Sequence, residues 1–236
     1  MRPMHQICVI LAGGLGTRLR SVVSDVPKCL APVGDRTFLD VQIARLAAEG
    51  VQEVVLSLGY LADTVIAAVQ RVDHGIPVRC VVEPQLLGTG GAIAHVLQTC
   101  DLDEVLVANG DTYLDGDLSS LLAPLDQAGG ECLRMAAVQV PDRARFGGIE
   151  IDPNSRVTGF VEKGHAGAGL INAGLYRLSR KALPTRQAAT VYSLEADVLP
   201  SLVKARGVRA QVIAAEFIDI GVPEDYRRFC DAHGSC

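Results

Sequence analysis

The chain has 236 residues, of which 22 are basic and 27 acidic, so its formal net charge is -5. A hydrophobic fraction of 49% supplies enough apolar side chains for a buried core, which excludes a disordered protein and suits one large α/β domain. Because there is no basic excess, we do not expect a protein that binds nucleic acid through its overall charge.

The seven cysteines are scattered along the sequence, without a CxxC pair or a Cys/His cluster at zinc spacing. This pattern is typical of reduced thiols, so we expect a cytoplasmic protein. The apolar run near the N-terminus has only the length of one buried strand, and no apolar stretch approaches the ~20 residues that cross a bilayer. We therefore expect no membrane partner.

The first part of the chain alternates short apolar runs with segments of helical period. The runs predict strands at residues 7–11, 53–58, 78–82 and 105–108, and the periodic segments predict helices at 38–49, 62–71 and 91–99. Repeated strand–helix–strand units predict a mostly parallel, Rossmann-like sheet with helices on both faces. Ligands of such sheets bind at the carboxyl ends of the strands.

From Leu133 onward the pattern becomes β-rich, with Pro and Gly turns between shorter segments. We predict strands at residues 133–140, 148–151, 157–161, 170–178 and 210–214, a helix near 193–205 and a closing helix from Pro223. No linker separates the two regions. The expected organisation is a single domain over residues 1–236, with one part at about 1–132 and a second, β-rich part at about 133–236.

A glycine-rich loop follows the first predicted strand, where residues 11–20 read LAGGLGTRLR. Three glycines let backbone N–H groups approach an anion such as a triphosphate, and Arg18 adds a cation with bidentate geometry for phosphate. The segment matches neither the Rossmann dinucleotide loop nor the Walker loop. A tight turn alone would explain the glycines but neither Thr17 nor Arg18.

Lys28 follows this loop in the segment DVPKCLAP, residues 25–32, where Pro27 and Pro32 restrict the backbone. A lone lysine is usually a solvated surface residue. In this rigid segment, however, we expect its positive charge to be held near the glycine loop.

Together these segments resemble the opening signature of the sugar nucleotidyltransferase family. Further resemblances to that family follow in order at residues 83–92 (EPQLLGTGGA), 109–111 (NGD), 146–148 (FGG), 162–163 (EK), 171–176 (INAGLY), 193–195 (SLE) and 217–221 (FIDIG). The resemblance thus extends from residue 8 to about residue 226.

Membership would imply a nucleotidyltransferase (GT-A-like) fold with a small β-rich sugar-binding subregion. It would also imply transfer of a nucleoside monophosphate from an NTP to a sugar 1-phosphate, with release of pyrophosphate and dependence on Mg²⁺. The part at 1–132 would then bind the nucleotide, and the part at 133–236 would bind the sugar.

The resemblance assigns roles to individual residues. The implied nucleotide-binding residues are Leu11, Ala12, Gly13, Gly14, Gly16, Thr17, Arg18, Lys28, Gln85, Gly88 and Thr89. The implied sugar-phosphate-binding residues are Asn109, Gly148, Glu162, Lys163 and Asn172. Asp111 and Asp219 would bind the metal, and the implied catalytic residues are Arg18, Lys28, Asp111 and Lys163.

The chemistry of phosphoryl transfer agrees with these residue types. The attacking oxygen of a sugar phosphate is already ionised near neutral pH, so the reaction needs no general base. It needs cations that bring two anions together, and Mg²⁺ prefers a pair of carboxylates with phosphate oxygens.

Structural alternatives exist for some of these residues. Asp219 could cap the helix at Pro223, and Asn172 could make only a local hydrogen bond at the end of a strand. Similarly, Gln85, Gly88 and Thr89 could form only a turn and a helix start.

Within the family, residues 19–28 (LRSVVSDVPK) resemble guanylyltransferases that act on D-glycero-D-manno-heptose 1-phosphate and supply GDP-heptose for bacterial surface polysaccharides. GTP and this heptose 1-phosphate are therefore the expected substrates. The nearest alternative is a uridylyltransferase acting on N-acetylmuramate 1-phosphate or a hexose 1-phosphate. Related enzymes are often oligomeric, so the resemblance also allows a homo-oligomer.

Two other classes of protein are alternatives. A catalytically silent nucleotide-binding relative would be indicated by loss of Arg18, Lys28, Asp111 or Asp219, and all four are present. An NAD-dependent oxidoreductase would carry an acidic residue at the end of the second strand, where this chain instead reads SLGY, residues 57–60.

Overall fold

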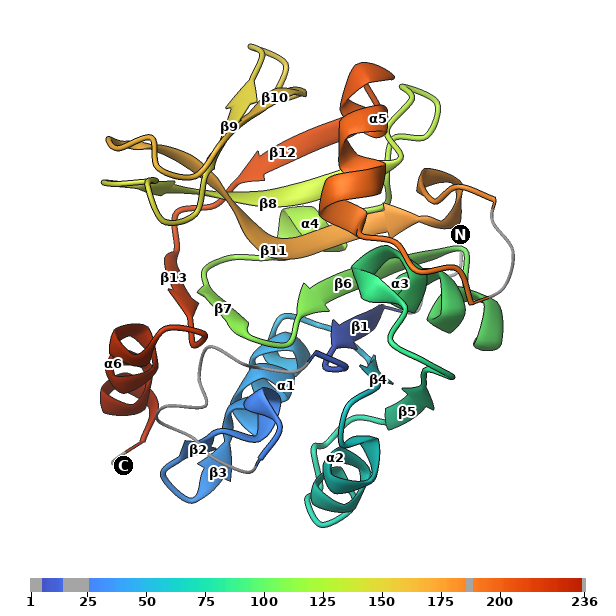
Figure 1. Cartoon of the computed structure of the whole chain (residues 1–236), viewed down its shortest axis with the longest axis vertical. Helices are drawn as coiled ribbons and strands as arrows, with labels where there is room; N and C mark the ends of the chain where they lie inside the picture. Colours follow the sequence, from blue (N-terminus) through green and yellow to red (C-terminus); the bar gives the residue numbers. More distant parts are fainter. Residues whose placement is uncertain (1–5, 15–25, 186–188, 235–236) are drawn as a thin grey trace.

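The computed structural model describes residues 6–14, 26–185 and 189–234. Within these residues, a nine-stranded mixed sheet has the order β10-β9-β11-β6-β1-β4-β5, and β8 pairs with β11 and with β12 (Figure 1). Its strands are β1 (Ile7–Leu11), β4 (Glu53–Leu58), β5 (Val78–Val82), β6 (Glu104–Asn109), β8 (Leu133–Val140), β9 (Gly148–Ile151), β10 (Val157–Val161), β11 (Gly169–Ser179) and β12 (Val208–Val212).

The sheet combines a parallel region with an antiparallel one. β1 pairs in parallel with both β4 and β6, and β4 pairs in parallel with β5. β11 then runs antiparallel to β6 and to β8. The predicted mixed α/β sheet is confirmed, and one continuous sheet contains strands from both parts of the chain.

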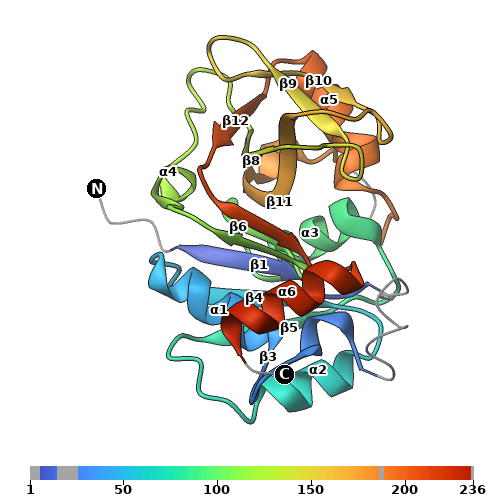
Figure 2. The same ribbon diagram turned by 90° about the vertical axis from the view of Figure 1, so that its left-hand side faces the viewer.

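Helices cover both faces of the parallel region. Along β1, Cys8 and Ile10 pack in one apolar cluster with residues of α1 (Phe38–Ala48) and α2 (Ala62–Val69). Ile7 and Val9 pack on the opposite face with residues of α3 (Gly88–Thr99), and Figure 2 shows α1 and α3 on opposite sides of β1. Burial on both faces explains why β1 reads as a continuous apolar run.

Short elements complete the described chain. They are the hairpin of β2 (Pro32–Val33) and β3 (Arg36–Thr37), α4 (Ser119–Leu122), α5 (Leu199–Lys204), the 3₁₀ helices η1 (Lys28–Leu30) and η2 (Arg180–Ala182), and the π-helix η3 (Leu194–Val198). No helix within the described ranges is both long and apolar enough to cross a membrane.

A separate two-stranded ribbon connects distant parts of the sequence. β7 (Thr112–Asp115) pairs antiparallel with β13 (Glu216–Asp219), so that Asp219 is the register partner of Thr112. The closing helix α6 (Pro223–His233) packs beside this ribbon, where the ring of Phe229 lies 5.0 Å from the rings of both Phe38 and Tyr113. This packing brings the segment near residue 219 against the end of β6.

Most predicted elements agree with the structure. The helix predicted near residues 193–205 is divided into the π-helix η3 and α5, and the other differences lie at the ends of elements. α3 begins at Gly88 rather than at the predicted residue 91, and β12 begins two residues before the predicted residue 210 because Val208 pairs with Leu133 of β8. β2, β3, β7 and α4 were not predicted, since elements of two to four residues show no periodicity.

The glycines at the start of α3 allow close packing against the segment that precedes η3. The backbone N–H groups of Gly90 and Gly91 both donate to the carbonyl of Tyr192, at 3.0 and 3.2 Å. A Cβ atom at Gly90 would lie 2.4 Å from the ring of buried Tyr192, and one at Gly91 would lie 2.6 Å from the carbonyl oxygen of Thr190. Side chains at these positions would force the two segments apart.

We therefore predict that Gly90→Ala destabilises the fold by about 1–3 kcal/mol, the usual cost of overpacking a filled interior. The measurement is the free energy of unfolding from urea denaturation. Gly159→Ala is the control, because its Cβ would make only an ordinary contact at 3.4 Å with Glu150. Equal stability of Gly90→Ala and wild type would contradict the packing described here.

Candidate active site

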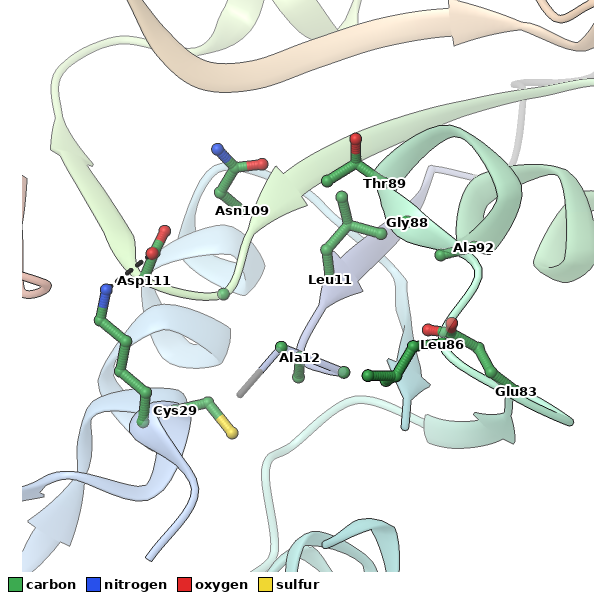
Figure 3. Close-up of a pocket in the computed structure, with 14 residues that line it drawn as sticks. Leu11, Ala12, Cys29, Glu83, Leu86, Gly88, Thr89, Ala92, Asn109 and Asp111 are labelled. Atoms are coloured by element: carbon green, nitrogen blue, oxygen red, sulfur yellow. Dashed lines mark hydrogen bonds and ion pairs between the residues drawn. The ribbon is translucent and has the colours of Figure 1, made fainter. Parts of the chain in front are cut away.

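A cavity of about 520 Å³ opens at the carboxyl ends of β1 and β6 (Figure 3). It lies between the loop after β1, the 3₁₀ helix η1 and the start of α3. The lining residues are Leu11, Ala12, Gly13, Gly14, Lys28, Cys29, Glu83, Leu86, Gly88, Thr89, Ala92, Asn109, Gly110 and Asp111. Its position agrees with the general rule that ligands of parallel sheets bind at the carboxyl ends of the strands.

The loop after β1 is held close to its neighbours. The N–H of Ala12 donates to the carbonyl of Ser57 at 2.9 Å, and the N–H of Gly110 donates to the carbonyl of Leu11 at 3.0 Å. A Cβ at Gly13 would lie 2.7 Å from Oε1 of Glu83 and 3.0 Å from the backbone nitrogen of Gly59. Glycine at residue 13 therefore keeps the loop against the floor of the cavity.

Three charged side chains meet at one end of this cavity. The Nζ atom of Lys28 lies 2.7 Å from Oδ2 of Asp111 and 3.6 Å from Oδ1 of Asp219. In Figure 3, Asp111 lies at the side of the cavity away from Glu83. One ammonium group thus pairs with two carboxylates that come from distant parts of the sequence, and it balances one of their two negative charges.

Backbone N–H groups hold the main chain of Asp111 and the carboxylate of Asp219 in place. The N–H of Ile220 donates to the carbonyl of Asp111 at 3.0 Å, and the N–H of Gly221 donates to Oδ1 of Asp219 at 2.8 Å. The N-cap of α6 is Val222, so Asp219 is not the cap of this helix as the alternative would require.

The pair of carboxylates fits a divalent cation. Both oxygens that face Lys28 lie within 4 Å of a single positive charge, and the side chains of Asp111 and Asp219 are 30% and 15% exposed. Within the described residues, no group of three or more acidic, Cys or His side chains could hold an ion by itself. An ion here would need further oxygen ligands, and Mg²⁺ commonly takes them from substrate phosphates.

A second cavity, of about 490 Å³, shares Asn109 and Asp111 with the first. Its other lining residues are Thr112, Arg145, Phe146, Gly147, Gly148, Ile149, Phe160, Val161, Glu162, Lys163, Asn172, Gly174, Tyr176, Glu195, Leu199, Phe217 and Asp219. Among the described residues, those that line the first cavity lie between 11 and 111, whereas the second cavity draws mainly on residues 145–219. The two cavities meet where the three charged side chains lie.

The second cavity has both aromatic and charged walls. The rings of Phe146 and Phe217 make an edge contact with centroids 5.4 Å apart. The guanidinium group of Arg145 lies 4.3 Å from the centroid of Phe146 and forms an ion pair with Asp225. Lys163 is exposed at this cavity, where its ammonium group can reach an anion.

The structure brings together most of the residues singled out from the sequence. Leu11, Ala12, Gly13, Gly14, Lys28, Gly88 and Thr89 line the first cavity, and Asn109, Gly148, Glu162, Lys163 and Asn172 line the second. Gly16, Thr17 and Arg18 lie outside the described residues. The exposed side chain of Gln85 donates to the carbonyl of Ala189 at 3.0 Å and is not in the described lining of the first cavity.

Asn172 was predicted either to contact the sugar phosphate or to make only a local hydrogen bond at the end of a strand. Its Nδ2 donates to the hydroxyl of Tyr176 at 2.7 Å, and its Oδ1 accepts from the N–H of Gly174 at 3.0 Å. The local hydrogen bonds are therefore present, and the same side chain also lines the second cavity.

Several residues that line the cavities had no individual role predicted from the sequence. They include Cys29, Glu83, Leu86 and Ala92 in the first cavity, and Arg145, Phe160, Tyr176 and Glu195 in the second. Glu83, Tyr176 and Glu195 fall inside segments that resemble the family, so those segments carried a signal for their importance. Arg145 carried no such signal, because it lies just outside the FGG segment.

Glu83 is a second carboxylate in the lining of the first cavity, in addition to Asp111. Burial raises the pKa of its carboxyl group above the ordinary value, although the N–H of Leu87 and the hydroxyl of Ser57 oppose the shift. The N–H of Leu87 donates to Oε2 of Glu83 at 2.8 Å, so the carboxylate holds the turn that leads into α3.

Comparison with known proteins finds nucleotidyltransferases by family model, by sequence and by structure. The family model described as Nucleotidyl transferase matches residues 7–233. The chain is 37% identical over 221 residues to a D-glycero-alpha-D-manno-heptose 1-phosphate guanylyltransferase of Campylobacter jejuni, covering 94% of this chain and 97% of that protein. A protein of the same name from Aneurinibacillus thermoaerophilus is 34% identical over 220 residues, covering 93% of this chain and 95% of that protein.

The fold is also similar to the crystal structure of HddC from Yersinia pseudotuberculosis complexed with GMP-PN. The TM-score is 0.83 and the identity 37%, covering 96% of this chain and 99% of that one. The expected nucleotidyltransferase fold is thereby confirmed.

We predict that Glu83→Gln changes how stability depends on pH. A carboxyl group whose pKa is raised by folding binds more protons in the folded than in the unfolded state, so its ionisation costs stability as pH rises from the ordinary value of 4.5 through the raised pKa. Glutamine has no such cost. The stability of the variant relative to wild type should increase with pH across this window and then level off. Urea denaturation at a series of pH values measures it, and a constant difference would contradict the prediction.

Proposed function

The chain belongs to the nucleotidyl transferase family, and we propose that it transfers GMP from GTP to D-glycero-D-manno-heptose 1-phosphate. The products are GDP-heptose and pyrophosphate. The similarity to two heptose 1-phosphate guanylyltransferases supports the sugar, and the similarity to a structure complexed with GMP-PN supports the guanine nucleotide.

The observation that carries this proposal is the shared wall of the two cavities. Asp111 borders both of them, and Lys28 and Asp219 lie beside it. Transfer between two phosphate-bearing substrates requires that the anions meet in line, with cations at the point of contact. A nucleotide in the first cavity and a sugar 1-phosphate in the second would meet at this wall.

Each part of the single domain then has its own substrate. We assign the nucleotide to the part at 1–132, with the loop after β1, Lys28, Gly88 and Thr89 as its contacts. Residues 16–18 and Gln85 remain proposed contacts by resemblance. The sugar 1-phosphate belongs to the part at 133–236, where Lys163 pairs with the phosphate and Glu162 and Asn172 accept or donate hydrogen bonds to hydroxyl groups. Gly148 and Asn109 would line the second cavity beside these contacts.

Nucleotidyl transferases generally use divalent metal ions, and we propose Mg²⁺ for this chain. Asp111 and Asp219 would hold the ion, which supplies positive charge to the phosphate oxygens during transfer. Lys28, whose ammonium group pairs with the same two carboxylates, would then be available to the phosphates of the nucleotide.

The reaction needs little covalent assistance from side chains. An oxygen of the sugar phosphate attacks the α-phosphorus of GTP, and the bond from that phosphorus to the bridging oxygen breaks as pyrophosphate leaves. Because the attacking oxygen is already ionised, no side chain has to remove a proton. Lys28, Lys163 and, by resemblance, Arg18 act by orienting the phosphates and balancing their charge.

We predict Mg²⁺-dependent release of pyrophosphate when the protein is given GTP and D-glycero-D-manno-heptose 1-phosphate. The assay compares GTP, UTP, dTTP, CTP and ATP against heptose, mannose, glucose and N-acetylmuramate 1-phosphates, with and without Mg²⁺. If another pair gives release of pyrophosphate, that pair would replace the proposed substrates. If no pair gives release of pyrophosphate, the proposed reaction would be contradicted.

In the same assay, Asp111→Asn should reduce turnover at least about 100-fold, because it removes a charge from the proposed metal site. The melting temperature should stay close to that of wild type. Asp103→Asn is the matched control, since this side chain is 96% exposed and lies away from both cavities. Unchanged turnover in Asp111→Asn would refute the assignment of Asp111.

A further inference from the structure

A hydrogen-bond network centred on Glu195 connects the walls of the two cavities. Glu195 lines the second cavity, and Thr89 lines the first. The hydroxyl of Thr89 lies 2.6 Å from Oε2 of Glu195, although the two residues are 106 positions apart in the sequence. The start of α3 is therefore tied directly to a wall of the second cavity.

Two more hydroxyl groups bond to the same carboxylate. Ser193 donates to Oε2 of Glu195 at 3.0 Å, and the fully buried hydroxyl of Tyr176 is also bonded to Glu195. Burial and then the negative charge of Glu195 raise the pKa of Tyr176, so this phenol keeps its proton. Tyr176 is thus available as a donor to the carboxylate.

An ionised carboxylate only accepts hydrogen bonds, and this sets the direction of every bond around it. Because Thr89 must donate to Glu195, its oxygen is left to accept, and it accepts from the N–H of Leu194 at 2.8 Å. The hydrogen bonds that join α3 to the segment beside η3 therefore all run in one direction, from the N–H of Leu194 through the hydroxyl of Thr89 to Glu195.

The charge of Glu195 also sets the direction of the hydrogen bonds at Tyr176 and Asn172, which line the second cavity. Because Tyr176 donates to Glu195, its oxygen accepts from Nδ2 of Asn172 at 2.7 Å. Oδ1 of Asn172 must then point the other way, and it accepts from the N–H of Gly174 at 3.0 Å. The charge on Glu195 thereby fixes which face of the Asn172 amide the second cavity presents.

The backbone at Glu195 is also unusual. Glu195 lies in η3, a single π-helical turn between Ser193 and α5, and such turns are rare and frequently occur at functional sites. Ser193 caps the turn by accepting from the N–H of Ala196 at 3.1 Å. The turn aims a half-buried carboxylate at the junction between the cavities rather than at solvent.

We propose that Glu195 is a positioning residue for both substrates, which orients Asn172 toward the sugar and holds Thr89 at the nucleotide. The inference rests on the proposed function. Its distinguishing feature is that the charge of Glu195, and not only its shape, sets the orientation of the two contact residues.

The test replaces the carboxylate by its neutral isostere, Glu195→Gln. A glutamine amide must donate at one end, so at least one of the three hydroxyl groups has to reverse its direction. We expect the KM for the sugar 1-phosphate to rise about 10-fold, the effect of one misdirected hydrogen bond to a charged group, while kcat falls less than threefold. The dissociation constant of a non-hydrolysable GTP analogue, measured by calorimetry, should rise as well.

Two further variants separate the sides of the network. Tyr176→Phe should raise the KM for the sugar 1-phosphate and leave binding of the GTP analogue unchanged. Thr89→Val should instead weaken binding of the GTP analogue. When Tyr176→Phe is added to Glu195→Gln, the KM should rise by less than the product of the single effects, because both changes release the same amide.

Ser193→Ala is the matched control, since it removes a hydroxyl donor from the same oxygen of Glu195 but Ser193 is absent from the described linings of both cavities. It should lower the melting temperature and leave both the KM for the sugar 1-phosphate and the dissociation constant of the GTP analogue unchanged. If Glu195→Gln behaves like Ser193→Ala, or if its effect multiplies with that of Tyr176→Phe, the positioning role is refuted. Wild-type turnover in the same assay keeps this outcome distinct from failure of the proposed reaction.

Discussion

The ammonium group of Lys28 between the carboxylates of Asp111 and Asp219 is the constraint on which the site depends. Two carboxylates this close repel each other unless a cation lies between them. The three residues come from η1, from the turn after β6 and from the end of β13. The ribbon of β7 and β13 and the aromatic packing of α6 bring these segments together. The proposed divalent ion would take over the neutralisation that Lys28 provides, which links metal binding to the release of a lysine for the nucleotide.

The mixed sheet explains why the three charged side chains lie where two cavities meet. Its parallel region ends at the first cavity, and the antiparallel strands that continue from β11 build the second. Since β6 and β11 are neighbours, the two cavities share a wall at the end of β6. The hydrogen bond between Thr89 and Glu195 ties the cavities a second time, from the side of α3, so that their walls are connected rather than independent.

Much of this architecture can be predicted from the sequence, for identifiable reasons. The apolar runs of β1 and β4 are nearly continuous because both faces of the sheet are covered there, and the predicted bounds of β1, β4 and β5 agree with the structure. The four-residue strand β7 has no periodicity to detect, and its partner lies about a hundred residues away. Gly88 was predicted to contact the nucleotide and lines the first cavity, whereas the close packing of Gly90 against Tyr192 and of Gly91 against Thr190 depends on a segment about a hundred residues away. Glu195 could not be assigned a role because its partners, Thr89 and Tyr176, meet it only in the folded chain.

The most direct measurement is a crystal structure with Mn²⁺ and a non-hydrolysable GTP analogue, in which anomalous diffraction locates the ion. We predict an anomalous peak contacting the carboxylates of Asp111 and Asp219 and a phosphate oxygen of the analogue, with the ammonium group of Lys28 moved to the phosphates. A peak away from these two carboxylates, or a bound nucleotide with Lys28 still paired to both of them, would contradict it.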